Sequence, residues 1–144
     1  MAALKVDGSV VTWGKAADGG DSSAVQSLLV GVQRVYSNSK AFAAVTSAGR
    51  VVTWGRASYG GDIPTDKASA LSSGVVSIYS TNRAFAALKS DGSVVIWGQT
   101  GHGGSAGAAV VAQLRSEVHT ICSNDAAFSA IKRNGAVLAW GHSA

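Results

Sequence analysis

The dipeptide Trp-Gly occurs four times in this chain of 144 residues, at nearly equal intervals. The intervals between its tryptophans are 41, 43 and 43 positions, and the tryptophans are Trp13, Trp54, Trp97 and Trp140. Two further markers keep the same phase: a glycine five residues before each Trp (Gly8, Gly49, Gly92 and Gly135) and a phenylalanine in an Ala-Phe pair (Phe42, Phe85 and Phe128). Self-similarity at one fixed period of a few tens of residues indicates a repeat architecture.

Each repeat is predicted to contain a β-hairpin, and the third copy shows it best. Residues 75–80 are β-branched and aromatic, as strands prefer. A short polar turn at 81–83 leads into the apolar run 84–88. Asp91-Gly92 then supplies the two positive-φ positions of a tight hairpin turn before the run 93–97, which ends in Trp97.

The segment between one hairpin and the next strand pattern is harder to assign. A Gly-rich loop with a Gly-Gly pair follows the first three Trp-Gly dipeptides, and then come the runs 25–30, 67–72 and 110–114. We expect these runs to form a short fourth strand, with a turn of helix as the alternative.

These patterns predict an all-β fold of tandem antiparallel blades of about 43 residues each, in a partial, propeller-like array of about three and a half blades. The small Ala-Ala pairs in the hairpins allow neighbouring sheets to approach closely. We expect one repeat domain over residues 1–144, with a half unit at 1–20 and units near 21–61, 62–104 and 105–144.

The hairpin with Asp91-Gly92, the strand that ends in Trp97-Gly98, and Gly103 six residues after that Trp together resemble the regulator-of-chromosome-condensation repeat family. The pattern returns around Trp13, and more loosely around Trp54 and Trp140, so the resemblance covers essentially the whole chain. The family pattern differs at several positions. Its usual glycine before the second hairpin strand is replaced by Asn38, Thr81 and Asn124. The resemblance implies a propeller fold and, as one family activity, guanine-nucleotide exchange on a small GTPase.

Composition excludes several classes of protein. With 47% apolar and 14% charged residues, the chain is too apolar for a disordered segment, and no apolar stretch is long enough for a membrane span. The first residues lack the order of a secretory signal, so we expect a soluble protein and favour an intracellular one, its compartment being otherwise unknown. The net charge of +4 comes from scattered basic residues, which gives no clear sign of a nucleic-acid partner.

Little in the sequence indicates catalysis or cofactor binding. The single cysteine, Cys122, excludes an internal disulfide and a Cys-based metal site, and its apolar surroundings predict a buried thiol. The histidines His102, His119 and His142 lack metal-ligand spacing. Asp21 and Asp62 follow Gly-Gly pairs, where turn capping is the commoner role. We therefore expect no enzyme, no cofactor and no metal.

The recurring tryptophans are expected to pack between sheets. Stacking on a ligand is the alternative, and the resemblance adds a further one, because the family includes a plant ultraviolet photoreceptor that senses light through tryptophans.

The sequence thus predicts a non-catalytic scaffold that binds another protein through variable loops; the loop residues singled out are Asp21, Asp62, Ile63, Pro64, His102 and Ser105. Unpaired terminal strands are expected to act as edges. Three arrangements remain open: self-association, docking of the edges on another protein, or a place within a longer repeat protein. Nucleotide exchange and glycan binding are the alternative functions.

Overall fold

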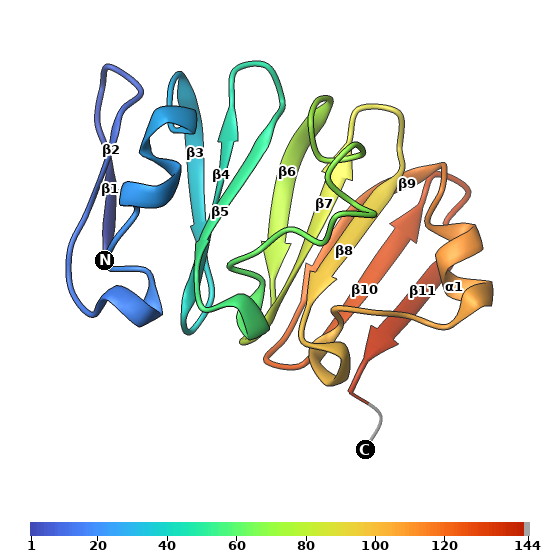
Figure 1. Ribbon diagram of the computed structural model, residues 1–144. Coiled ribbons are helices and arrows are strands. Elements are labelled where there is room, and N and C mark those ends of the chain that lie inside the picture. The colour runs from blue at the N-terminus through green and yellow to red at the C-terminus, as the bar shows by residue number, and fades with distance from the viewer. Residues whose placement is uncertain (143–144) are drawn as a thin grey trace.

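The computed structural model describes residues 1–142, whose strands form four antiparallel sheets standing side by side (Figure 1). The first sheet has two strands, β1 (Ala2–Leu4) and β2 (Val10–Thr12). The other three have three each: β3 (Val32–Ser37), β4 (Ala41–Thr46) and β5 (Val51–Gly55); β6 (Val75–Ser80), β7 (Ala84–Lys89) and β8 (Val94–Gly98); β9 (Val118–Ser123), β10 (Ala127–Lys132) and β11 (Val137–Gly141). This confirms the predicted all-β array of blades.

The second and third strands of each full sheet form the predicted hairpin, but the prediction of two positive-φ turn residues is wrong, because only Gly92 and not Asp91 has a positive φ. In the third sheet Phe85 pairs with Trp97 and Leu88 with Val94, and the turn between them contains Gly92 at a φ of 82°. Only glycine adopts this φ readily, because a side chain at a positive φ meets its own backbone.

The predicted fourth strand is wrong, because the connecting runs are helical or turns. They include η2 (Ser23–Leu28) and α1 (Ala108–Gln113), and backbone turns in residues 64–72. The physical reason is the apolar spacing. Each run buries one leucine, Leu29, Leu71 or Leu114, and in the outer two a valine four residues earlier is half-buried. A spacing of four places two side chains on one face of a helix, whereas a strand alternates with a period of two.

The core consists of three apolar layers, one between each pair of neighbouring sheets. Between the second and third sheets, the small residues Ala41 and Ala43 of β4 face the large residues Phe85 and Trp97. All four are at most 2% exposed. Small residues on one sheet therefore provide the space that the aromatic pair of the next sheet fills.

One hydrogen bond per junction joins each tryptophan to the preceding unit. The indole Nε1 of Trp54 donates to the Gly19 carbonyl at 3.1 Å, that of Trp97 to Gly60 at 3.1 Å, and that of Trp140 to Gly103 at 3.2 Å. The short helices η1 (Ala16–Asp18), η3 (Ala57–Tyr59) and η4 (Thr100–His102) end at these glycines. A Cβ on Gly60 would lie 2.7 Å from the Phe85 ring, so only glycine fits beneath the aromatic pair.

Backbone hydrogen bonds also join the sheets at the hairpin end. Ser90 N–H donates to the Gly74 carbonyl and Arg133 N–H to the Glu117 carbonyl, at 2.9 and 2.8 Å. Gly31, Gly74 and Glu117 occupy the same place in successive units, with φ values of 63°, 75° and 62°. Among residues 1–142, Glu117 is the one residue with a side chain that has a positive φ.

We expect Trp97→Phe to lower the free energy of unfolding by about 2 kcal/mol, because it leaves the Gly60 carbonyl without its donor and shrinks a fully buried ring. Trp13 is the matched control, since its ring is 49% exposed. Trp13→Phe is expected to change stability by less than about 0.5 kcal/mol. Urea unfolding monitored by circular dichroism measures both, and equal losses for the two variants would contradict the role given to the indole hydrogen bond.

We expect Glu117→Gly to raise the free energy of unfolding by about 1 kcal/mol, because it removes a side chain from a left-handed backbone conformation. Glu117→Ala removes the same charge but keeps a Cβ, and it is expected to give no such gain. Parallel urea titrations of the two variants test this, and a gain from the alanine variant as large as that from glycine would assign the effect to charge.

Candidate interaction surface

A polar concave surface is built from three equivalent turns, each joining the first and second strands of a full sheet. These turns contain Ser37-Asn38-Ser39, Ser80-Thr81-Asn82 and Ser123-Asn124-Asp125, and they line one groove of about 490 Å³. We call this end of the array the turn face. The hairpin turns that contain Gly49 and Gly92 join the other ends of the strands.

Hydrogen bonds between successive turns hold the floor of this groove. Ser39 N–H donates to the Asn82 carbonyl at 3.3 Å, and Asn82 N–H donates to the Asp125 carbonyl at 2.9 Å. The Ser80 hydroxyl donates to the Ser37 carbonyl at 3.0 Å. The groove therefore crosses three sheets as one continuous, pre-formed polar surface.

The middle residue of each turn anchors it locally. The Asn38 side-chain oxygen accepts hydrogen bonds from the N–H groups of Lys40 and Ala41, and its Nδ2 donates to the Tyr59 carbonyl at 2.7 Å. The Thr81 hydroxyl likewise donates to the His102 carbonyl at 2.8 Å. Sequence reasoning noted these positions only as departures from a family pattern and did not assign them to a surface. The sequence feature that could have assigned these positions to a surface is that they are polar in every full unit.

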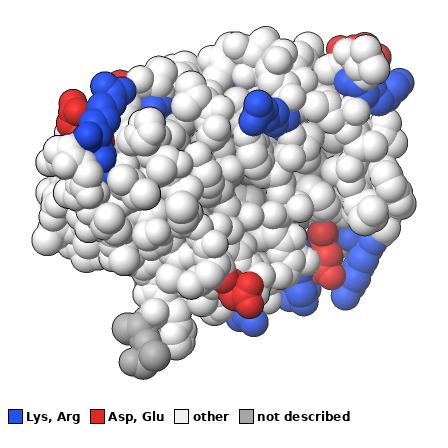
Figure 2. Space-filling view, turned by 180° about the vertical axis from the view of Figure 1, so that it is seen from behind, with Lys and Arg blue, Asp and Glu red and all other residues white. Residues whose placement is uncertain are grey.

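Positive charge gathers beside the groove, around Tyr59 at the end of η3. The charged ends of Lys40, Arg56 and Arg83 lie 5.7, 5.8 and 5.2 Å from the centre of the Tyr59 ring. Lys40 directly follows Ser39 in sequence, and Arg83 directly follows Asn82. Figure 2 shows that charged side chains lie mainly along the two ends of the sheets and leave the middle of that view largely uncharged.

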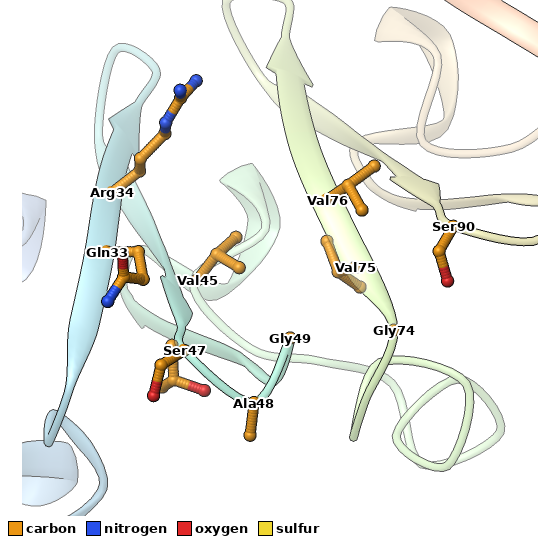
Figure 3. Close-up of a pocket in the computed structure, with 11 residues that line it drawn as sticks. Gln33, Arg34, Val45, Ser47, Ala48, Gly49, Gly74, Val75, Val76 and Ser90 are labelled. Atoms are coloured by element: carbon orange, nitrogen blue, oxygen red, sulfur yellow. The ribbon is translucent and has the colours of Figure 1, made fainter.

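A second hollow, of about 360 Å³, lies between the second and third sheets near their hairpin ends (Figure 3). Gln33 and Arg34 line it from β3, and Val75 and Val76 line it from β6. Arg34 is its sole charged lining residue, and the polar side chains of Gln33, Thr46, Ser47 and Ser90 also line it.

The loop residues singled out from the sequence do not form one site. Asp21 accepts a hydrogen bond from Ser23 N–H at 2.9 Å, and this bond lowers the pKa of its carboxyl below the ordinary value. Ile63 packs against the core between the second and third sheets, while Asp62, Pro64 and Ser105 are exposed. The His102 carbonyl accepts from a turn-face residue, and the ring is half-buried.

The repeat markers lie where the sheets meet, except in the first sheet. Phe42, Phe85 and Phe128 stack on Trp54, Trp97 and Trp140 with ring centres 5.3 to 5.4 Å apart. Trp13 is half exposed, and Val11 on the same hairpin is 50% exposed. At the other end of the array Val137 of β11 is 64% exposed, so both outermost sheets present apolar side chains.

Within residues 1–142, no three His, Cys, Asp or Glu side chains converge as metal ligands. Among these same residues no helix is long and apolar enough to cross a membrane. The hairpin aspartates Asp7 and Asp91 have a lowered pKa because they accept hydrogen bonds from the hydroxyl and N–H groups of Ser9 and Ser93, which is a turn-stabilising role.

The predicted burial of Cys122 is wrong, because its side chain is exposed. Tyr36, Tyr79 and Cys122 occupy the same position in β3, β6 and β9, and the two tyrosines pack against the following sheet. In the described residues no sheet follows the fourth, so nothing covers Cys122. Its apolar neighbours in sequence point to the opposite face of the strand.

No family model matches this chain, and no curated protein sequence matches it either. Solved structures do match its fold. Human WBSCR16 superposes with a TM-score of 0.63 over 97% of this chain and 44% of its own, at 18% identity. The CRINKLY WD40 ectodomain of the Arabidopsis thaliana receptor kinase ACR4 gives 0.54 over 99% and 47%, at 19% identity.

A third match is Prp20p, the RCC1 protein of Saccharomyces cerevisiae, which binds Gsp1p and histones. Its TM-score is 0.50 over 76% of this chain and 30% of Prp20p, at 14% identity. These similarities show that the chain has an RCC1-like β-propeller fold. It spans less than half the length of each of these structures.

We expect Cys122 to react in the folded protein with a thiol reagent such as Ellman's reagent, at a rate close to that of the unfolded chain, because the thiolate is exposed and unhindered. One equivalent of released thiolate is the expected result. The variant Cys122→Ser supplies the blank, and a thiol that reacts only after urea is added would contradict the exposure.

Proposed function

We propose that this chain is a non-catalytic protein-interaction module that presents its turn face to a partner protein. The observation that carries this proposal is the polar groove over three sheets, whose floor is fixed by backbone hydrogen bonds between the turns. A surface that is ordered before binding loses little conformational entropy when a partner docks, which is how rigid repeat arrays recognise extended surfaces.

Several features of the described residues support a binding role over catalysis. Hydroxyls, amides and backbone groups dominate the groove, and Asp125 is its one charged lining residue. Such groups pair well with an extended peptide backbone and its side chains. We further propose that residues 1–144 act as one repeat domain, with the exposed loop residues Asp62, Pro64 and Ser105 as secondary contacts.

Guanine-nucleotide exchange and glycan binding have less support. The similarity to Prp20p, at 14% identity, concerns the fold alone. A glycan-binding repeat would place a similar pocket at every junction, whereas the hollow of about 360 Å³ between β3 and β6 and the hollow of about 530 Å³ beside Trp140 are lined by different kinds of residue. We therefore do not propose either activity.

An unbiased selection of random twelve-residue peptides displayed on phage tests the proposed function. We expect enrichment of peptides whose affinity falls about tenfold in the variant Ser37→Trp, because its indole fills the groove. Synthetic copies of the enriched peptides measured by fluorescence anisotropy give the affinities.

Ser27→Trp is the matched control, since Ser27 is equally exposed but lies in η2, outside the groove. Peptides that bind the wild type and this control equally, and lose binding to Ser37→Trp, support the proposal. A selection without enrichment, or with peptides indifferent to Ser37→Trp, would refute it.

A further inference from the structure

The position just before each Gly-Gly pair differs between units, although the backbone around it is the same. It is occupied by Asp18 in the first unit, Tyr59 in the second and His102 in the third. Each ends a short 3-10 helix and precedes a glycine with a φ of 90° to 94°. Since the helix ends at a junction between two sheets, this residue faces both of them.

The first junction shows what a carboxylate does at this position. Asp18 lies 3.6 Å from the Lys15 ammonium and 3.1 Å from the Arg56 guanidinium, so it links a cation of the first unit to one of the second. Its side chain is 24% exposed, which makes it the least exposed acid in these ion pairs. Asp18 thus gives both cations of this junction an ion-pair partner within the chain.

The second junction has three cations, and only Arg56 among them has a carboxylate partner, the Asp18 of the first junction. Tyr59 stands in the place of Asp18, and Lys40, Arg56 and Arg83 surround its ring. Among the described residues no carboxylate lies within ion-pair distance of Lys40 or Arg83. Clustered like charges repel one another, so the folded chain bears a cost here that an added negative charge would offset.

The repeat itself shows that the fold does not require these cations. Lys40 and Arg83 correspond to Ala126 in the fourth sheet, and Arg56 corresponds to Gln99 in the third. The residues that hold the sheets together recur in every full unit, whereas uncharged Gln99 and Ala126 take the place of these cations in later units. Charged residues that break the repeat at half-buried positions are candidates for function.

We propose that the junction around Tyr59 binds a carboxylate side chain of an acidic peptide segment that lies along the turn-face groove. This inference rests on the proposed function and names the chemistry of the partner. Lys40 and Arg83 would bind the carboxylate in the role that Lys15 and Arg56 have toward Asp18, while the groove holds the neighbouring peptide backbone. Asp125 lines the far end of the groove, so acidic residues are expected only at the end nearest Tyr59.

A nucleic acid is the less favoured ligand. Single-stranded nucleic acids are bound by basic tracks with free aromatic faces on which bases stack. Here the cluster is confined to one junction, and three cations already lie over the ring of its half-buried tyrosine.

The test uses a fluorescein-labelled peptide of eight residues, with two glutamates at one end and serine and glycine elsewhere, measured by anisotropy at about 50 mM salt. We expect the double variant Lys40→Ala/Arg83→Ala to bind it about fivefold more weakly than wild type, because two partly buried ion pairs are lost. Each change introduces the residue that the fourth sheet has at this position, so folding is expected to be retained.

The matched control is Arg50→Ser/Arg133→Ser, which removes the same charge at exposed positions near the hairpin turns, where other units have serine. It should bind as wild type does. A third variant, Tyr59→Asp, introduces the carboxylate of the first junction and is expected to lose binding as the double variant does. Tyr59→His, which introduces the third unit's residue without negative charge, should retain binding at pH 8.

Four results would overturn the proposal: equal binding by wild type and Lys40→Ala/Arg83→Ala, equal loss in the arginine control, unchanged binding by Tyr59→Asp, or equal affinity for a peptide with lysine in place of glutamate. A single-stranded oligonucleotide that binds more tightly than the peptide, through the same cations, would also overturn it in favour of nucleic acid. If phage selection yields neutral peptides that still fail to bind Ser37→Trp, the interaction module stands and only the acidic preference falls.

Discussion

The array depends on one repeated interaction, the hydrogen bond from an indole N–H to the carbonyl of a glycine in the preceding unit. A tryptophan can be fully buried between two sheets only if its one polar group finds an acceptor there. The acceptor lies on a loop that passes over the stacked phenylalanine, and only glycine leaves room for that passage. The Trp, the Phe and the Gly-Gly pair are therefore parts of a single joint, which is why they recur in phase.

This joint also explains the position of the turn face. The indole bond holds each Gly-Gly loop against the next sheet, and Asn38 and Thr81 bind carbonyls in the helices that lead into these loops. The turns are thereby brought into line, so that each can hydrogen-bond the next. A groove across three sheets results from contacts that each extend over one junction only.

Within such an array, function is expected where the units differ. The residues that join the sheets have little freedom to vary, because each loss leaves a cavity or an unpaired polar group in the core. The residues at the ends of the short helices, such as Asp18, Tyr59 and His102, lie at the junctions between sheets. They make no stabilising contact that all units share. Substitutions at these positions change the charge of a junction without changing the fold. The same scaffold can therefore bind different partners.

The sequence alone determined the period, the hairpins and the sheet array, because local turn chemistry and a buried tryptophan leave a visible pattern in every unit. It misled on the connecting runs, where one buried leucine per run was too little signal to separate strand from helix, and on Cys122, whose exposure depends on whether another sheet packs against the fourth. Only the tertiary structure placed Lys40, Arg56 and Arg83 around the Tyr59 ring. The three cations lie near the ends of different strands, in two different sheets. Charges scattered along a chain become a cluster only when neighbouring sheets bring equivalent positions together, and that proximity follows from packing rather than from any local pattern.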